Sequence, residues 1–157
     1  MTLQGTKQLP ITVAVSNKTD MRIQFAALCW RANNGKPEVL LITSRRTNRW
    51  IVPKGWPQTG MTPGEGALTE AWEEAGVKGK VFDRSLGLFS YAKKVEDGIL
   101  PCVAMVYPVK VTKLAKEFPE AGQRKREWFS PKKAASLVQE PELAMILRHF
   151  DPKLLKN

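Results

Sequence analysis

Residues 55–77 read GWPQTGMTPGEGALTEAWEEAGV, and this stretch determines how the rest of the chain is interpreted. The segment Thr62-Pro63-Gly64-Glu65 has the form of a capping box with proline at the first helical position, so a helix begins there. Gly76 is the residue type that most often ends a helix, and the predicted helix therefore runs to Ala75. At about 100° per residue, small and apolar side chains fall on one side, which is expected to pack on the core: Ala67, Leu68, Ala71 and Ala75.

A different side of the same helix carries three carboxylates. Glu70, Glu73 and Glu74 stand at i, i+3 and i+4, where helical side chains are neighbours, and like charges so placed repel. A divalent cation reverses this cost, because Mg²⁺ and Mn²⁺ bind carboxylate oxygens. The alternative is a solvated acidic face balanced by nearby lysine or arginine. Two features favour the cation: the chain is very basic elsewhere, and a turn-forming loop at residues 53–60 leads into the helix.

The remaining segments predict a mixed α/β fold. Apolar and aromatic runs predict six strands, at residues 23–31, 39–43, 50–52, 86–91, 102–111 and 127–129. The fifth of these is apolar on both faces, which is typical of a central strand. A second helix is predicted from Ser130-Pro131, and a third from an apolar stripe at Leu143, Ile146, Leu147 and Phe150. Interleaved strands and helices indicate the α/β class.

Length and composition limit the class of protein. The chain has 157 residues and is 43% hydrophobic, which fits one domain, expected over residues 21–157 after a polar, loosely ordered segment at residues 1–20. No apolar run is long enough to cross a membrane and no secretory signal is evident, so no membrane partner and a cytoplasmic location are expected. Cys29 and Cys102 lie in apolar runs and predict buried thiols. The net charge of +10 favours an anionic partner: nucleic acid, an anionic surface or a phosphate-rich small molecule.

Residues 55–77 resemble the Nudix box, usually written G-x5-E-x7-R-E-U-x-E-E-x-G-U. Seven residues stand at the matching spacings: Gly55, Glu70, Ala71, Glu73, Glu74, Gly76 and Val77. Residues 25–31, 39–53 and 124–129 are similar to the diphosphoinositol and diadenosine polyphosphate phosphohydrolase branch, and the similarity extends over residues 22–150. The resemblance implies a Nudix α/β/α sandwich with a mixed central sheet, in a monomer or homodimer. It also implies cleavage of a phosphoanhydride bond that depends on Mg²⁺ or Mn²⁺.

The resemblance also assigns site residues. Glu70, Glu73 and Glu74 would be catalytic metal ligands, one of them doubling as the base, and the carbonyl of Gly55 would be a further ligand. Glu117 and Glu120 precede the last predicted strand and are candidates for one more ligand or base, and we include Glu120 in the predicted metal set.

The chain departs from the box at two positions. Met61 stands where the box has its first Glu, and Thr69 stands where it has Arg. An arginine at position 69 would reach Glu73 one turn on, whereas threonine is shorter and uncharged. We expect the two missing family side chains to pair with each other, so that losing both leaves no orphan charge. The prediction is a weakened but working site, while the capping-box position of Glu65 predicts a structural role.

Basic residues near strand ends are predicted to bind substrate phosphates, because the arginine fork suits phosphate geometry. The predicted substrate is an anionic polyphosphate such as a diadenosine polyphosphate or an inositol pyrophosphate. The predicted substrate-binding set is Ser44, Arg45, Arg46, Arg49, Lys54, Arg124, Lys125 and Arg126.

Other interpretations stay open. A degenerate Nudix domain that binds polyphosphate or nucleic acid without turnover explains Met61 and Thr69. A nucleoside triphosphate or RNA 5′-end pyrophosphohydrolase shares the box, which does not choose among substrates. A nucleic-acid-binding module explains the charge but not the three carboxylates, so nucleic acid is the less favoured partner. A serine or cysteine hydrolase lacks parts, since His149 is the single histidine and no G-x-S-x-G motif is present.

Overall fold

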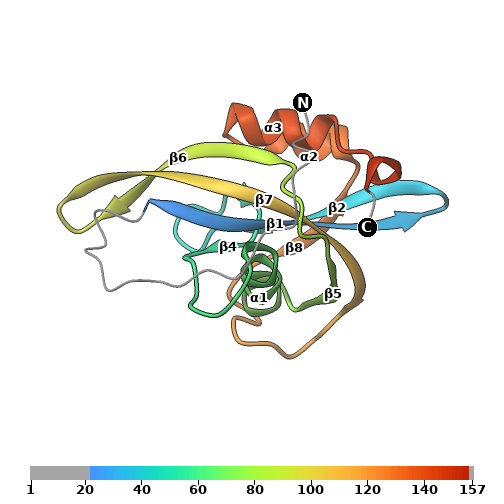
Figure 1. Cartoon of the computed structure of the whole chain (residues 1–157), viewed down its shortest axis with the longest axis horizontal. Helices are drawn as coiled ribbons and strands as arrows, with labels where there is room; N and C mark the ends of the chain where they lie inside the picture. The colour runs from blue at the N-terminus through green and yellow to red at the C-terminus, as the bar shows by residue number, and fades with distance from the viewer. Residues whose placement is uncertain (1–21, 156–157) are drawn as a thin grey trace.

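The computed structural model describes residues 22–155, so the segment predicted over residues 1–20 lies outside them. One mixed sheet of eight strands forms the centre (Figure 1). β1 (Ile23–Asn33) runs parallel to β7 (Gly98–Leu114), and the other described pairs are antiparallel. The order is β3-β2-β1-β7-β5, with β4 beside β1, β6 beside β7 and β8 beside β2. The other strands are β2 (Lys36–Thr43), β3 (Trp50–Ile51), β4 (Lys54–Gly55), β5 (Val77–Val81), β6 (Gly87–Val95) and β8 (Arg126–Phe129).

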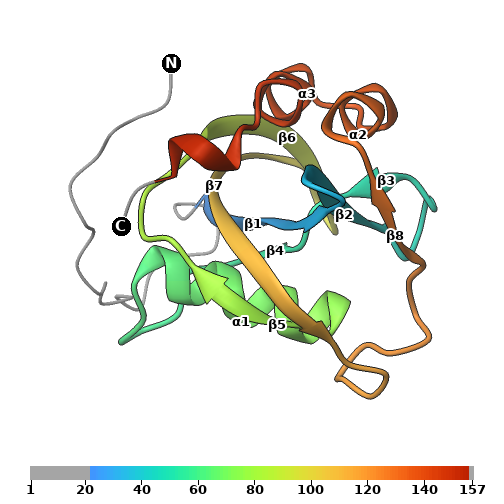
Figure 2. The same cartoon turned by 90° about the vertical axis from the view of Figure 1, so that its right-hand side faces the viewer.

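Helices cover both faces of this sheet, as Figure 2 shows. α1 (Pro63–Ala75) lies on one face, and α2 (Pro131–Leu137) and α3 (Pro141–Arg148) lie on the other, followed by a short 3-10 turn at Pro152–Leu154. Two apolar cores result. One lies between α1 and the sheet and includes Ala71 and Tyr107, and the other lies under α2 and α3 and includes Leu143 and Leu147. The predicted α/β/α sandwich with a mixed sheet is confirmed.

The first helix begins and ends where the local sequence predicts. The Thr62 hydroxyl accepts from the Glu65 N–H at 3.1 Å, and Glu65 Oε1 accepts from the Thr62 N–H at 3.0 Å. Gly76 takes a left-handed backbone with φ 67°, and its N–H donates to the Trp72 carbonyl at 3.0 Å. Both halves of the capping box are therefore formed, and Glu65 has a structural role.

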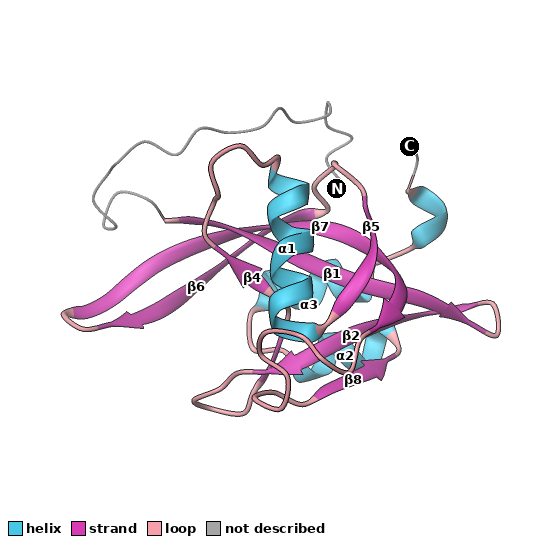
Figure 3. Cartoon of the chain, turned by 90° about the horizontal axis from the view of Figure 1, so that it is seen from below, coloured by secondary structure: helices cyan, strands magenta, loops and turns pink. Residues whose placement is uncertain are grey.

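The β6–β7 hairpin is longer than its apolar runs predict. Pairing continues out to Val95 opposite Gly98, because cross-strand hydrogen bonds satisfy the backbone of a polar stretch. β7 is central, as predicted, since it pairs with β1 on one edge and with β6 and then β5 on the other. Its apolar faces are not buried along their whole length, since Val103 is 36% exposed. The reason is visible in Figure 3, where the hairpin extends well beyond α1.

The two cysteines behave as small buried apolar residues. Cys29 and Cys102 are free and buried, as predicted, and burial raises the pKa of the Cys29 thiol to about 12. Because both thiols are buried, neither is accessible to react as a nucleophile.

None of the helices in residues 22–155 has the length and apolar character needed to span a membrane.

Candidate active site

α1 buries one side and presents its carboxylates on another. Ala67, Ala71 and Ala75 are fully buried in the core between α1 and the sheet. Glu70, Glu73 and Glu74 are half-buried on the rest of the helix. The helical period that packs the alanines therefore sets the direction of all three carboxylates.

β4 lies directly against these carboxylates. The Lys54 N–H donates to Glu74 Oε1 at 3.2 Å, and Gln58 Nε2 donates to Glu70 Oε2 at 3.4 Å. A Cβ on Gly55 would lie only 2.2 Å from Glu70 Cδ, a distance that real contacts do not reach. Glycine at this position thus makes room for the Glu70 carboxylate beside the backbone of β4.

Burial and mutual repulsion raise the pKa values of two α1 carboxylates, Glu70 and Glu74. Burial, and after it the charges of Glu74, Glu73 and Glu120, raises the pKa of Glu70 to about 7, while the Gln58 hydrogen bond opposes the shift. Burial also raises the pKa of Glu74, against the opposing charges of Arg124 and Lys54. The site therefore holds negative charge in a partly desolvated place, which a cation relieves.

Ionisation of Glu70 is expected to destabilise the metal-free fold. Its folded-state pKa of about 7 lies above the ordinary 4.5, so the folded chain holds more protons than the unfolded chain between these values. The free energy of unfolding therefore falls as pH rises through this window. Thermal unfolding in a chelator should give a lower Tm at about pH 8 than at about pH 5, and Glu70→Gln should remove much of that difference. Glu117→Gln, at an exposed carboxylate, is the control; an unchanged pH dependence in Glu70→Gln contradicts the prediction.

Arg124 connects α1 to the loop between β7 and β8. Its Nη2 lies 3.4 Å from Glu74 Oε2, its Nε lies 3.1 Å from Glu120 Oε1, and its Nη1 donates to the Thr43 carbonyl at 3.1 Å. The side chain is only 8% exposed, so water screens these contacts weakly. The Glu120 N–H also donates to the Glu73 carbonyl at 3.0 Å. The structure thus places Glu120 beside the α1 carboxylates, whereas Glu117 is exposed.

The donor set suits Mg²⁺ or Mn²⁺ in chemical type, because these ions take carboxylate and carbonyl oxygens. The crowding of charge and the space at Gly55 agree with such an ion. Within residues 22–155, however, no three His, Cys, Asp or Glu side chains already converge as a metal site. Glu74 instead contacts Arg124 and the Lys54 backbone, so holding an ion requires carboxylate rotation.

The two residues that depart from the box pattern contact each other. The Thr69 hydroxyl lies 3.6 Å from Met61 Sδ and donates to the Glu65 carbonyl at 3.0 Å. The side chains that stand in place of Glu and Arg are therefore neighbours. Their joint replacement leaves a neutral contact rather than one unpaired charge.

The loop between β2 and β3 carries four of the predicted phosphate-binding residues. The Ser44 hydroxyl organises this loop, because it lies 2.6 Å from Thr47 Oγ1 and accepts from the Arg49 N–H at 3.1 Å. Arg45 Nη1 lies 3.7 Å from Glu120 Oε1, which brings it to the carboxylate cluster. Arg46 is exposed in the same loop, and Arg49 pairs with Glu140 of the α3 N-terminus at 2.8 Å.

The remaining predicted cations are dispersed. Arg126 donates to the carbonyls of Ala75 and Ala115, both at 2.7 Å, which holds the end of α1 and favours a structural role. Lys125 has an exposed side chain, and its backbone N–H donates to Thr43 Oγ1 at 2.9 Å. Lys54 places its ammonium 4.9 Å from the centre of the Tyr91 ring.

Sequence reasoning missed three residues that contact the site. Gln58 touches Glu70, Glu140 holds Arg49, and Tyr91 of β6 carries the Lys54 ammonium. Gln58 had a signal in the sequence, since it lies in the turn-forming loop at residues 53–60. The other two come from distant elements, and only the packing of α3 and β6 brings them near.

Comparisons with known proteins agree with this geometry. The family model for the NUDIX domain matches residues 22–154. Human diphosphoinositol polyphosphate phosphohydrolase 3-alpha is 36% identical over 116 residues, which are 73% of this chain and 67% of that protein.

Two solved structures share the fold. A C. elegans Ap4A hydrolase has a TM-score of 0.60 at 17% identity, over 86% of this chain and 99% of that one. The E. coli dihydroneopterin triphosphate pyrophosphohydrolase has a TM-score of 0.63 at 13% identity, over 82% and 94%. With the box residues gathered on α1 and β4, and with a family match over nearly all described residues, the chain belongs to the NUDIX family and is a Nudix hydrolase.

Proposed function

We propose that this chain hydrolyses a phosphoanhydride bond in a polyphosphorylated small molecule, with Mg²⁺ or Mn²⁺ held by Glu70, Glu73 and Glu74. The observation that carries the proposal is the fit of the Glu70 carboxylate against Gly55, because a glycine is needed there only if the carboxylate must reach the strand. The names of the relatives support the substrate class: one is a diphosphoinositol polyphosphate phosphohydrolase, and a structural neighbour is an Ap4A hydrolase.

The chain's own residues supply most of the chemistry. A divalent cation held by Glu70, Glu73 and Glu74 would supply Lewis-acid chemistry, lowering the pKa of water and offsetting charge on phosphate oxygens. One carboxylate of the α1 cluster accepts the proton of the attacking water. Arg124 positions Glu74 and Glu120, and the exposed forks of Arg45 and Arg46 bind phosphate oxygens of the substrate.

A substrate panel tests the proposal. Release of phosphate and nucleotide is measured with Mg²⁺ or Mn²⁺ from diadenosine polyphosphates, an inositol pyrophosphate, inorganic polyphosphate and nucleoside triphosphates. We expect metal-dependent turnover that is fastest on the longest polyphosphates. Saturable binding without turnover of any member supports the second candidate, a polyphosphate-binding domain, which the engagement of Glu74 by Arg124 favours.

Restoring the box arginine tests how far the altered positions weaken the site. Thr69→Arg should raise kcat/KM by up to about tenfold or leave it unchanged, because the arginine adds a charged hydrogen bond to a neighbouring carboxylate. Met61→Glu combined with Thr69→Arg should exceed either single variant, since the two side chains touch. Steady-state kinetics with Mg²⁺ give the comparison. A large loss in Thr69→Arg shows instead that Thr69 has a role of its own.

A further inference from the structure

The sheet face on which α1 packs extends beyond α1 along the β6–β7 hairpin (Figure 3). Phe25 of β1 and Met105 of β7 are register partners and pack in the core under α1. Two residues earlier on the same strands, Ile23 and Val103 are also partners and therefore share that face, yet both are exposed. The apolar surface of the sheet thus continues past the helix that buries it.

This exposed apolar surface runs along both strands of the hairpin. On β7, Ile99 and Pro101 alternate along the same face as Val103, and on β6 Ala92 lies opposite Pro101. Ile99 is 67% exposed and Ile23 is 49% exposed. Single exposed apolar residues are ordinary, whereas a contiguous group marks an interaction site. We call this group the hairpin apolar face, and its members are Ile23, Leu88, Ala92, Ile99, Pro101 and Val103.

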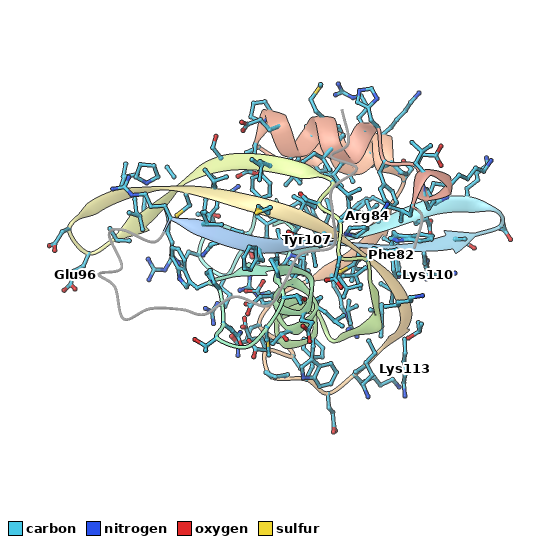
Figure 4. All side chains as sticks on the ribbon, viewed as in Figure 1. Phe82, Arg84, Glu96, Tyr107, Lys110 and Lys113 are labelled. Carbon is cyan, nitrogen blue, oxygen red and sulfur yellow. The ribbon has the colours of Figure 1, made fainter. Side chains whose placement is uncertain are left out.

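The chain enters β1 at the margin of the hairpin apolar face. The Val103 N–H donates to the Arg22 carbonyl at 2.8 Å, so residue 22 already lies beside β7. From there to the tip of the hairpin, which Glu96 marks in Figure 4, residues 98–102 of β7 pair only with β6 among the described strands. The chain before residue 22 therefore starts next to this face and is tethered to it at high effective concentration.

One stretch of the preceding sequence has the chemistry that this face requires. Residues 11–15 read ITVAV, so isoleucine and valine alternate with threonine and alanine. β-branched residues at every second position are typical of an extended segment that buries one side. No charged residue occurs at positions 8–17, so burial of this stretch removes no charge from water.

The connection to β1 is long enough to bring this stretch back over the hairpin. Residues 16–21 read SNKTDM, and serine, asparagine and aspartate favour turns. Six extended residues span roughly 20 Å, whereas Ile99 and Val103, four residues apart on β7, are separated by about 13 Å. A reversal of the chain at residues 16–21 therefore reaches any part of the hairpin apolar face.

We propose that residues 11–15 pack as an extended segment on the hairpin apolar face, with Ile11, Val13 and Val15 directed toward it. The other side of the hairpin carries Phe89, which is buried in the core under α2 and α3. With the segment bound, the hairpin is packed on both sides, as the inner part of the sheet already is. This contact needs neither metal nor substrate, so it is independent of the proposed function.

The tether and the charge favour this segment over a second copy of the chain as the occupant. Each copy carries a net charge of +10, so two copies repel each other. Lys94 is the register partner of Ile99 and lies on the same face of the hairpin, which adds a cation where two copies would meet. Residues 8–17 carry no charge and belong to the same chain.

Thermal unfolding of the full chain tests the covered face from the hairpin side. Ile99→Ser at a bare surface would change Tm little, whereas loss of a covered isoleucine should lower Tm by about 4–8 °C. Leu154→Ser is the matched control, because Leu154 is 66% exposed and lies outside the hairpin apolar face. The control should keep the wild-type Tm.

A second pair of variants tests the contact from the side of the segment. Val13→Asp should lower Tm by a similar amount, because it directs a carboxylate at the hairpin apolar face. Thr12→Asp adds the same charge at the neighbouring position, on the opposite side of an extended chain, and should change Tm little. The double variant of Val13→Asp and Ile99→Ser should lose less than the sum of the two single losses, since both changes break one contact.

Methyl NMR of the full chain gives the direct measurement. Nuclear Overhauser contacts from the methyl groups of Val13 to those of Ile99 or Val103 are the expected result. Wild-type Tm in both Ile99→Ser and Val13→Asp overturns the proposal, and so do additive losses without such contacts. A dimer in light scattering that Ile99→Ser dissociates and Val13→Asp does not would assign the face to a second copy and also overturn it.

Discussion

Glu74→Gln should lower metal-dependent turnover by roughly 10²–10³-fold, because it removes a ligand charge at the centre of the carboxylate cluster. Glu74 is the carboxylate that touches both the Lys54 backbone and Arg124. Glutamine has the same shape and can still accept the Lys54 N–H, so the fold should survive. Arg124 keeps its contact with Glu120 and is not left unpaired.

The measurement is kcat and KM with saturating Mg²⁺, together with the affinity of the metal-free chain for tripolyphosphate. The fall should be in kcat, while affinity should not decrease, since the substitution removes a negative charge. Glu117→Gln makes the same change of charge at an exposed position and should keep wild-type rates. A Glu74→Gln enzyme within a few-fold of the wild type rules out the proposed ligand set.

Gly55→Ala should lower turnover by about 10²-fold with little effect on folding, because a displacement of the order of 1 Å at a catalytic group has that effect. The added Cβ would fall 2.2 Å from Glu70 Cδ and 2.3 Å from its Oε1, so the carboxylate must leave its place. The backbone of Gly55 lies in a strand and has no positive φ, so alanine itself is tolerated there. The loss therefore reports on the carboxylate rather than on backbone strain.

Gly66→Ala is the control for this substitution. A Cβ at Gly66 lies 3.4 Å from the nearest atom of Phe25, an ordinary contact, and the position is inside α1. Alanine there should stabilise the helix by about 0.5–1 kcal/mol and keep the activity. Kinetics and thermal unfolding are measured for both variants. An active Gly55→Ala enzyme would show that turnover does not depend on the place that the Glu70 carboxylate takes beside Gly55.

Local signals made the first helix predictable. The capping box at Thr62, the stop at Gly76 and the period that separates alanines from glutamates all depend on residues within one or two turns. β4 and β5 were not predicted, since β4 has two residues and β5 alternates valine with lysine around Gly79. Such short strands exist because β1 and β7 offer them an edge, which is a property of the assembled sheet.

The same distinction between local signals and long-range packing applies to the site. Glu70, Glu73 and Glu74 share a helix face by spacing alone, so sequence predicts their proximity. The contacts of Glu120 with Arg124 and of Lys54 with Tyr91 depend on where a loop and a hairpin come to rest. Arg126 was likewise predicted to bind phosphate because it is a basic residue near a strand end. Its hydrogen bonds to two carbonyls instead depend on how the chain folds around the end of α1.

A ribosome that makes this chain releases β1 long before β7 exists. β1 and β2 can form a hairpin early through their tight turn, with Asn33 opposite Lys36, but the other edge of β1 stays open. That edge closes only when Val103 and the residues after it reach Ile23, a long-range parallel pairing of the kind that folds slowly. Nascent chains are therefore most exposed to aggregation before residues 98–114 are made. Arg124 and Glu120 are synthesised later still. The α1 carboxylates therefore lack their contacts with this loop until most of the protein has been made.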